Sequence, residues 1–102
     1  MAAAWLEGRT GRAPDALRRR VRRHLTDLGA GAADDPTPEA LAAAGRGALE
    51  QVLVHPGDRT VALDLLAADA LVTLALLAQA QRNPASLARF AAEVLRTGAA
   101  DA

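Results

Sequence analysis

The chain has 102 residues and a formal charge of zero, because 12 arginines balance 12 acidic residues. This length fits one domain, and the zero charge gives no overall attraction to nucleic acid or to a membrane. The lack of cysteine excludes disulfides, thiolate metal sites and a cysteine nucleophile.

Composition also predicts the fold class. Alanine occurs 27 times and leucine 16 times, against six valines and no isoleucine. Alanine and leucine are strong helix formers, so we expect an all-α protein, a compact antiparallel bundle of four main helices with a central apolar third helix. The domain should span residues 13–98, between an N-terminal arm at 1–12 and a frayed tail at 99–102. The first residues lack the apolar core of a signal peptide, so we expect a cytoplasmic protein.

The first elements are the arm and a helix over residues 14–28. Trp5 and Leu6 are the apolar anchors with which the arm can pack back on the bundle. The helix should begin at Pro14, which suits a first helical position, and end before Gly29. Its apolar residues fall at spacings of four, four and three and form one stripe, made of Leu17, Val21, Leu25 and Leu28.

The second helix should follow a loop at residues 29–37. Thr37 is its predicted cap, Pro38 takes the first helical position and Glu39 lies in the first turn. Gly45 and Gly47 fall inside this helix, where each costs up to about 1 kcal/mol relative to alanine. We interpret the two glycines as a close crossing with another helix, the alternative being a locally weak helix.

The third helix, residues 59–82, carries leucine and valine on almost every side. A helix that is apolar all round must be covered on most sides, so we expect Leu66, Leu74 and Leu77 to be fully buried. The segment is long enough to span a bilayer, but its two aspartates would be costly there, so we expect no membrane contact. The fourth helix starts at Asn83-Pro84, has a complete amphipathic pattern and should end at Gly98.

Two aspartates interrupt the apolar third helix. Asp64 and Asp69 lie about 140° apart on a helical wheel, so they do not converge as paired acid–base catalysts would need to. Such a residue can form a buried polar site. We favour instead an aspartate that pairs with an arginine of the first helix or lies in a thin exposed strip.

The strongest candidate for binding chemistry is the segment LRRRVRRHL at residues 17–25. Its arginines fan over most of the helix outside the apolar stripe, and arginines on a helix can contact phosphates. The candidate contacts to a polyanion or an acidic partner are Arg18, Arg19, Arg22 and Arg23. No aromatic stacking residue accompanies them, so we favour a solvated basic face whose side-chain stems cover apolar surface.

The remaining chemistry-bearing residues form no recognisable set. His24 and His55 are the only histidines and lie in different elements, whereas a metal site needs three or four ligands. The glycine-containing runs at 8–12 and 29–33 lack the spacing of phosphate-binding loops, and Ser86 is the only serine. We therefore predict no catalytic, cofactor-binding or metal-binding residues, no cofactor and no enzyme activity.

These observations favour a small interaction module of bacterial type that is non-catalytic and acts as a homodimer, as a binder of another protein, or as both. The third helix is apolar on more sides than three partner helices can easily cover. We expect self-association on the third or fourth helix, including Leu76 and Phe90. The alternative function is a nucleic-acid-associated protein that uses the arginine-rich first helix.

Overall fold

The computed structural model describes residues 4–29, 36–55, 57 and 59–100; for residue 4 and residues 97–100 the description covers the backbone alone. The described chain is all-α. Its elements are α1 (Ala4–Thr10), α2 (Asp15–Asp27), α3 (Pro38–Val54), α4 (Arg59–Arg82), the short 3-10 helix η1 (Pro84–Ser86) and α5 (Leu87–Ala100). The predicted loop at 29–37 lies mostly outside the described residues, and tail residues 101 and 102 lie wholly outside them.

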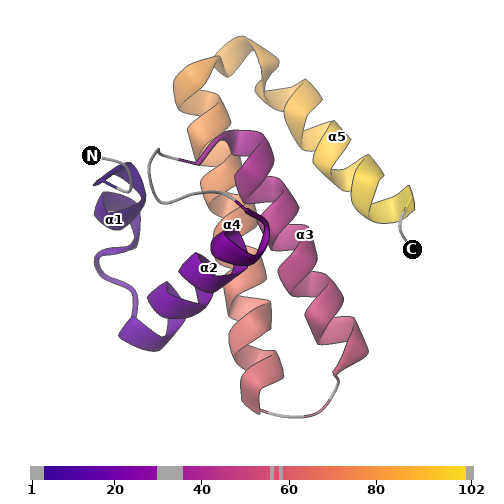
Figure 1. Ribbon diagram of the computed structural model, residues 1–102. Helices are drawn as coiled ribbons and strands as arrows, with labels where there is room; N and C mark the ends of the chain where they lie inside the picture. The colour runs from indigo at the N-terminus through magenta and orange to yellow at the C-terminus, as the bar shows by residue number, and fades with distance from the viewer. Residues whose placement is uncertain (1–3, 30–35, 56, 58, 101–102) are drawn as a thin grey trace.

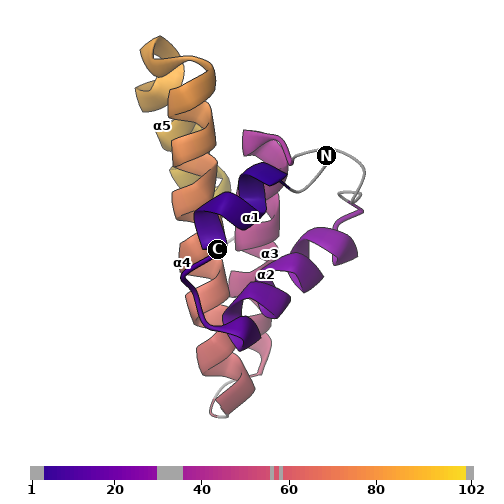
Figure 2. The same cartoon turned by 90° about the vertical axis from the view of Figure 1, so that its left-hand side faces the viewer.

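The centre of the molecule is an antiparallel pair formed by α3 and α4, and α2 packs across this pair, mainly on α4 (Figures 1 and 2). The core combines a few large side chains with many alanines. Its fully buried large residues are Val21 of α2, Leu41 of α3 and Leu71 of α4. Ala44, Ala48, Ala67 and Ala75 are buried between them. This confirms a compact helical bundle with a central third main helix.

The local signals for the first two main helices are also confirmed. Pro14 precedes α2, and Gly29 follows it with a φ of 84°, the left-handed conformation expected after a helix. At the start of α3, the Thr37 hydroxyl accepts a hydrogen bond of 3.0 Å from the backbone N–H of Ala40. The chain therefore begins both helices, and ends α2, within about one residue of where the sequence predicted.

A close crossing of α3 and α4 takes place at Gly45. A Cβ added there would lie 3.0 Å from Cγ2 of Val72 and 3.3 Å from Cβ of Leu71. A methyl group at this position would be in tighter than ordinary van der Waals contact, so the helices do approach closely at Gly45, as predicted. The same interpretation is wrong for Gly47, because a Cβ there would meet no atom within 4 Å.

The N-terminal arm forms α1 and packs back on the bundle. Leu6 is buried in the core, and Trp5 packs against it. The indole Nε1–H of Trp5 also donates a hydrogen bond of 2.8 Å to the side-chain oxygen of Gln81, near the end of α4. Both predicted anchors thus hold the arm.

The predicted burial of α4 is only partly right. Leu74 is buried, but Leu77 is half-buried and Leu66 is 55% exposed. The reason is that α2 and α3 cover two sides of α4, whereas α5 diverges from it and leaves a third side open (Figure 1). In the part of the chain that the structure describes, one helix, α4, is long and apolar enough to cross a membrane. Core helices of soluble bundles share this property.

The turn between α4 and α5 is held by side-chain hydrogen bonds. The buried Gln79 amide donates a hydrogen bond of 2.5 Å to the Ser86 hydroxyl, which in turn donates one of 3.0 Å to the backbone oxygen of Asn83. This turn sets the direction in which α5 leaves α4. The helix continues to Ala100, two residues past the predicted end at Gly98.

Candidate functional site

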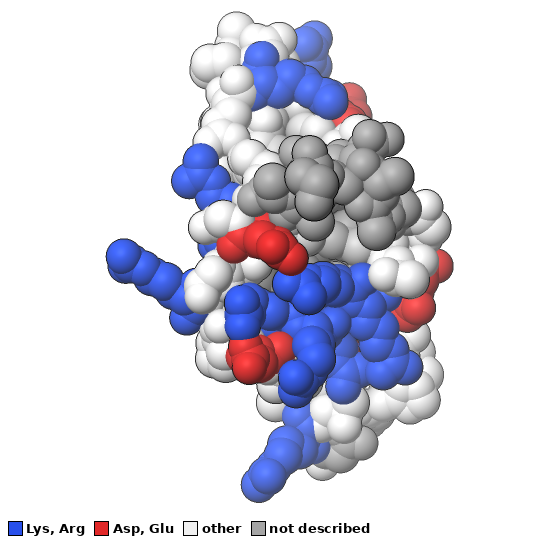
Figure 3. Space-filling model, turned by 60° about the vertical axis from the view of Figure 1, so that its left-hand side comes forward, with Lys and Arg blue, Asp and Glu red and all other residues white. Residues whose placement is uncertain are grey.

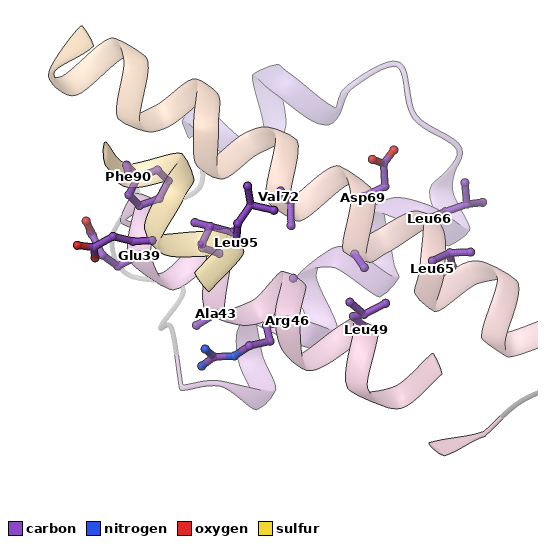
Figure 4. A pocket seen from close by; sticks show the side chains of 15 residues that line it. Glu39, Ala43, Arg46, Leu49, Leu65, Leu66, Asp69, Val72, Phe90 and Leu95 are labelled. Carbon is purple, nitrogen blue, oxygen red and sulfur yellow. The ribbon is translucent and has the colours of Figure 1, made fainter. Parts of the chain in front are cut away.

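An apolar groove of about 1030 Å³ lies between the α3–α4 pair and α5. Its wall on α3 includes Ala42, Ala43 and Leu49, and its wall on α4 includes Leu65, Leu66 and Val72. Phe90, Val94 and Leu95 of α5 close the remaining side (Figure 4). We refer to this feature as the α3–α4–α5 groove.

The groove exposes large apolar side chains. Leu65 is 50% exposed, Leu66 is 55% exposed and Leu95 is 75% exposed. Leu53 lies one helical turn beyond Leu49 on α3 and is 74% exposed, so it extends the same apolar face. A contiguous exposed apolar surface with polar residues around it is typical of a protein interaction site.

The groove exists because α5 packs on the bundle only partly. Among the side chains of α5 that the structure describes, none is buried. Phe90 reaches the edge of the core, whereas Leu95, five residues later and about 140° further round the helix at the margin of the apolar stripe, is mostly exposed. The apolar stripe of α5 thus faces the groove without filling it.

Charged residues surround the groove. Glu39 and Arg46 come from α3, Asp69 from α4 and Glu93 from α5 (Figure 4). Glu39 also pairs with Arg82 across 3.6 Å at an exposed position. Glu93 pairs in the same way with Arg96 across 3.6 Å, so the charges around the groove are largely balanced and its distinguishing feature is the apolar lining.

The two residues predicted for self-association lie in different surroundings. Phe90 is half-buried and lines the groove. Leu76 is half-buried on α4 and does not line it. Sequence reasoning missed the leucines of the groove walls, because periodicity cannot show which side of an all-apolar helix stays uncovered. The all-round apolarity of α4 was the one signal in the sequence that some side of this helix would stay uncovered.

A second feature is an ion cluster between α2 and α4. The Asp64 carboxylate is buried, with one oxygen 2.9 Å from Nε2 of His24 and 3.5 Å from Nε of Arg20. The predicted pairing of an aspartate of the third main helix with an arginine of the first is therefore confirmed. Asp69 is exposed, which is the other of the two arrangements that the sequence left open.

The ion cluster borders a polar cavity of about 280 Å³. Arg23, Asp27, Glu50 and Gln51 also line it. Its lining holds three carboxylates and one imidazole, and it includes no serine, threonine, cysteine, lysine or tyrosine. Because Asp64 already has two partners, we interpret the cluster as a structural contact that sets how α2 crosses α4.

The arginines of α2 form a basic surface interrupted by acids (Figure 3). Arg18 pairs with Asp15, and Arg22 pairs with Glu7 of α1 at 3.1 Å. The hydrogen bond from Arg18, together with its charge, lowers the pKa of the Asp15 carboxyl below its ordinary value. Arg19 and Arg23 are exposed and make no ion pair with the described residues. Two of the four predicted contacts are thus engaged within the chain, and two face solvent.

The described residues contain no group of three His, Cys, Asp or Glu side chains placed to hold a metal ion. His24 belongs to the ion cluster, and His55 is exposed after the end of α3. Comparisons with protein-family models, with curated proteins and with solved structures gave no match.

Proposed function

We propose that this protein is a non-catalytic interaction module that binds an amphipathic helix in the α3–α4–α5 groove. The observation that carries the proposal is the exposure of Leu65, Leu66 and Leu95 around one continuous apolar groove. Burying a leucine side chain stabilises a complex by about 1.5–3 kcal/mol, so several such contacts support specific binding. We place the protein in the cytoplasm.

A helix is the occupant that best fits the shape of this site. Two helices form the floor of the groove and a third stands apart from them, so a fourth helix would complete a bundle. Helix-in-groove recognition uses apolar anchors at positions i, i+3 or i+4, and i+7. The leucines and Val72 along the groove offer matching contacts.

Selection from a library of helical peptides tests this function. The folded wild-type chain is the bait. Peptides that also bind the Leu66→Asp variant are removed, because a carboxylate in the groove wall would oppose binding of an apolar ligand. Leu28→Asp is the matched control, since Leu28 is 48% exposed but lies on α2, outside the groove. We expect peptides with apolar anchors at helical spacing that bind the wild type and the control alike.

The proposal would be abandoned if no peptide distinguished the wild-type groove from the Leu66→Asp groove while both proteins kept the same helical circular dichroism. Both substituted leucines are about half-exposed, so neither variant is expected to unfold. The comparison therefore reports on binding rather than on stability.

A second candidate function is binding of nucleic acid through the basic surface of α2. The exposed side chains of Arg19 and Arg23 support it, because they are available to phosphates. The acidic residues Glu7 and Asp15 on the same surface, and the lack of a neighbouring stacking residue on α2, weigh against it. We therefore rank it below helix binding.

A further inference from the structure

We infer that the helix bound in the groove is α5 of a second copy of this chain, so that the protein forms a two-fold symmetric dimer. This inference rests on the proposed function and names its partner. In this dimer the apolar stripe of α5, which lines the groove of its own chain, would also contact the apolar wall of the partner's groove.

The first reason is that α5 is an amphipathic helix in need of cover. Its apolar stripe consists of Leu87, Phe90, Ala91, Val94 and Leu95. No described side chain of this helix is buried, and Leu95 is exposed over three quarters of its surface. A 14-residue helix gains little stability from its own hydrogen bonds, so a helix with this pattern is normally stabilised by packing.

The second reason is that α5 cannot easily fill the groove of its own chain. The hydrogen bonds from Gln79 to Ser86 and from Ser86 to Asn83 hold the turn, and Pro84 starts the 3-10 helix within it. Moving α5 onto the groove floor would require this braced turn to rearrange. This brace favours a helix from another molecule as the occupant of the groove, and a second copy supplies an amphipathic helix.

The third reason is the symmetry and size of the surface. In a two-fold dimer the same patch is used twice, so one arrangement covers two grooves and two α5 helices. The five exposed leucines of this face, at positions 49, 53, 65, 66 and 95, are between 44% and 75% exposed. At roughly 100 Å² of apolar surface per leucine, they supply about 300 Å² toward the roughly 800 Å² that each partner of a stable complex buries.

Sedimentation equilibrium of the full chain tests the inference, with wild type, Leu66→Asp, Leu95→Asp and the control Leu28→Asp compared. We expect the wild type and the control to show twice the chain mass of 10.5 kDa at about 100 µM. Each groove variant should dissociate about 10- to 100-fold more readily, because it replaces a leucine that the dimer buries.

Chemical crosslinking identifies the contact. Because the chain has no cysteine, Leu66→Cys and Leu95→Cys each introduce a single thiol. When the two variants are mixed, a short bismaleimide should join position 66 of one copy to position 95 of the other. A Leu28→Cys variant mixed with Leu95→Cys should give no such product.

A chain that remains monomeric at about 100 µM overturns the inference. So does a dimer that Leu66→Asp and Leu95→Asp leave intact. If the monomer still binds groove-dependent helical peptides, the proposed function stands and only its partner changes. If it binds none, both conclusions fall.

Discussion

The imidazole of His24 on α2 and the carboxylate of Asp64 on α4 lie 2.9 Å apart in a part of the fold that water scarcely reaches. Arg20 approaches the same carboxylate, so one aspartate joins two residues that are four apart on α2. This contact fixes the rotation of α2 on α4. It thereby places Val21 and Leu25 against the core and the other arginines toward solvent.

Removing the acidic partner should therefore destabilise the fold. We expect Asp64→Ala to lower the free energy of unfolding by about 2–3 kcal/mol, because His24 and Arg20 would be left largely buried without their acceptor. Asp69→Ala is the matched control. That aspartate is exposed, so its removal should change the free energy by less than about 0.5 kcal/mol. Urea denaturation measures both.

A double-mutant cycle separates the pairwise contact from the loss of a side chain. Combined with His24→Ala, Asp64→Ala should show a coupling energy of about 0.5–3 kcal/mol. Free energies that simply add would mean that the two side chains do not interact, and the account of how α2 is oriented would then need to be replaced.

The two glycines of α3 should respond in opposite ways to alanine. Gly47→Ala should stabilise the protein by about 0.5–1 kcal/mol, since the new methyl group meets open space and alanine is the better helix former. Gly45→Ala should destabilise it by about 1–2 kcal/mol, because the methyl group is forced against Val72 and Leu71. Thermal melts of the two variants give the comparison, and equal shifts in melting temperature would argue against the close crossing.

The loss of stability on replacing a leucine of α4 by alanine should depend on how deeply that leucine is buried. Leu74→Ala leaves a cavity and should cost about 2–5 kcal/mol. Leu66→Ala removes an exposed side chain and should cost less than about 1 kcal/mol when measured at a concentration low enough to keep the chain monomeric. Similar costs for the two variants would mean that α4 is covered on the side where the groove lies.

The salt dependence of binding to a generic DNA duplex tests the basic surface. If Arg19 and Arg23 each neutralise one phosphate, the slope of log K against log salt should be about −1.8, and Arg19→Ala should reduce its magnitude by about one unit. We expect instead an affinity no tighter than roughly 10⁻⁴ M at about 150 mM salt. Submicromolar binding under these conditions would place nucleic acid ahead of a helix as the ligand.

Much of the fold can be predicted because local signals act over a few residues. The Thr37 cap, Gly29 and the apolar stripe of α2 specify helices without reference to the rest of the chain. Asp64 could be matched to α2 because a buried carboxylate needs a cation and α2 holds most of the arginines of the chain's first half. These inferences depend on short-range geometry and on charge.

The groove could not be predicted in the same way. Leu66 and Leu74 occupy the same helix and have the same side chain, yet one is exposed and the other buried. The difference arises because α3 and α2 cover the side of α4 that carries Leu74, whereas Leu66 lines the groove. Hydrophobic periodicity does not show which side of an all-apolar helix is covered, so the sequence indicated an excess of apolar surface but not its position.

The most direct test of the groove as a binding surface is the reactivity of a single thiol placed in its wall by Leu66→Cys, with Leu28→Cys as the reference outside the groove. The account predicts that alkylation at position 66 slows about tenfold or more as the protein concentration rises from about 1 to about 200 µM, or as a groove-dependent helical peptide is added, because a bound helix covers the thiol. Alkylation at position 28 should keep a constant rate. An unchanged rate at position 66 under both conditions would contradict the account, because it would show that no helix occupies the groove.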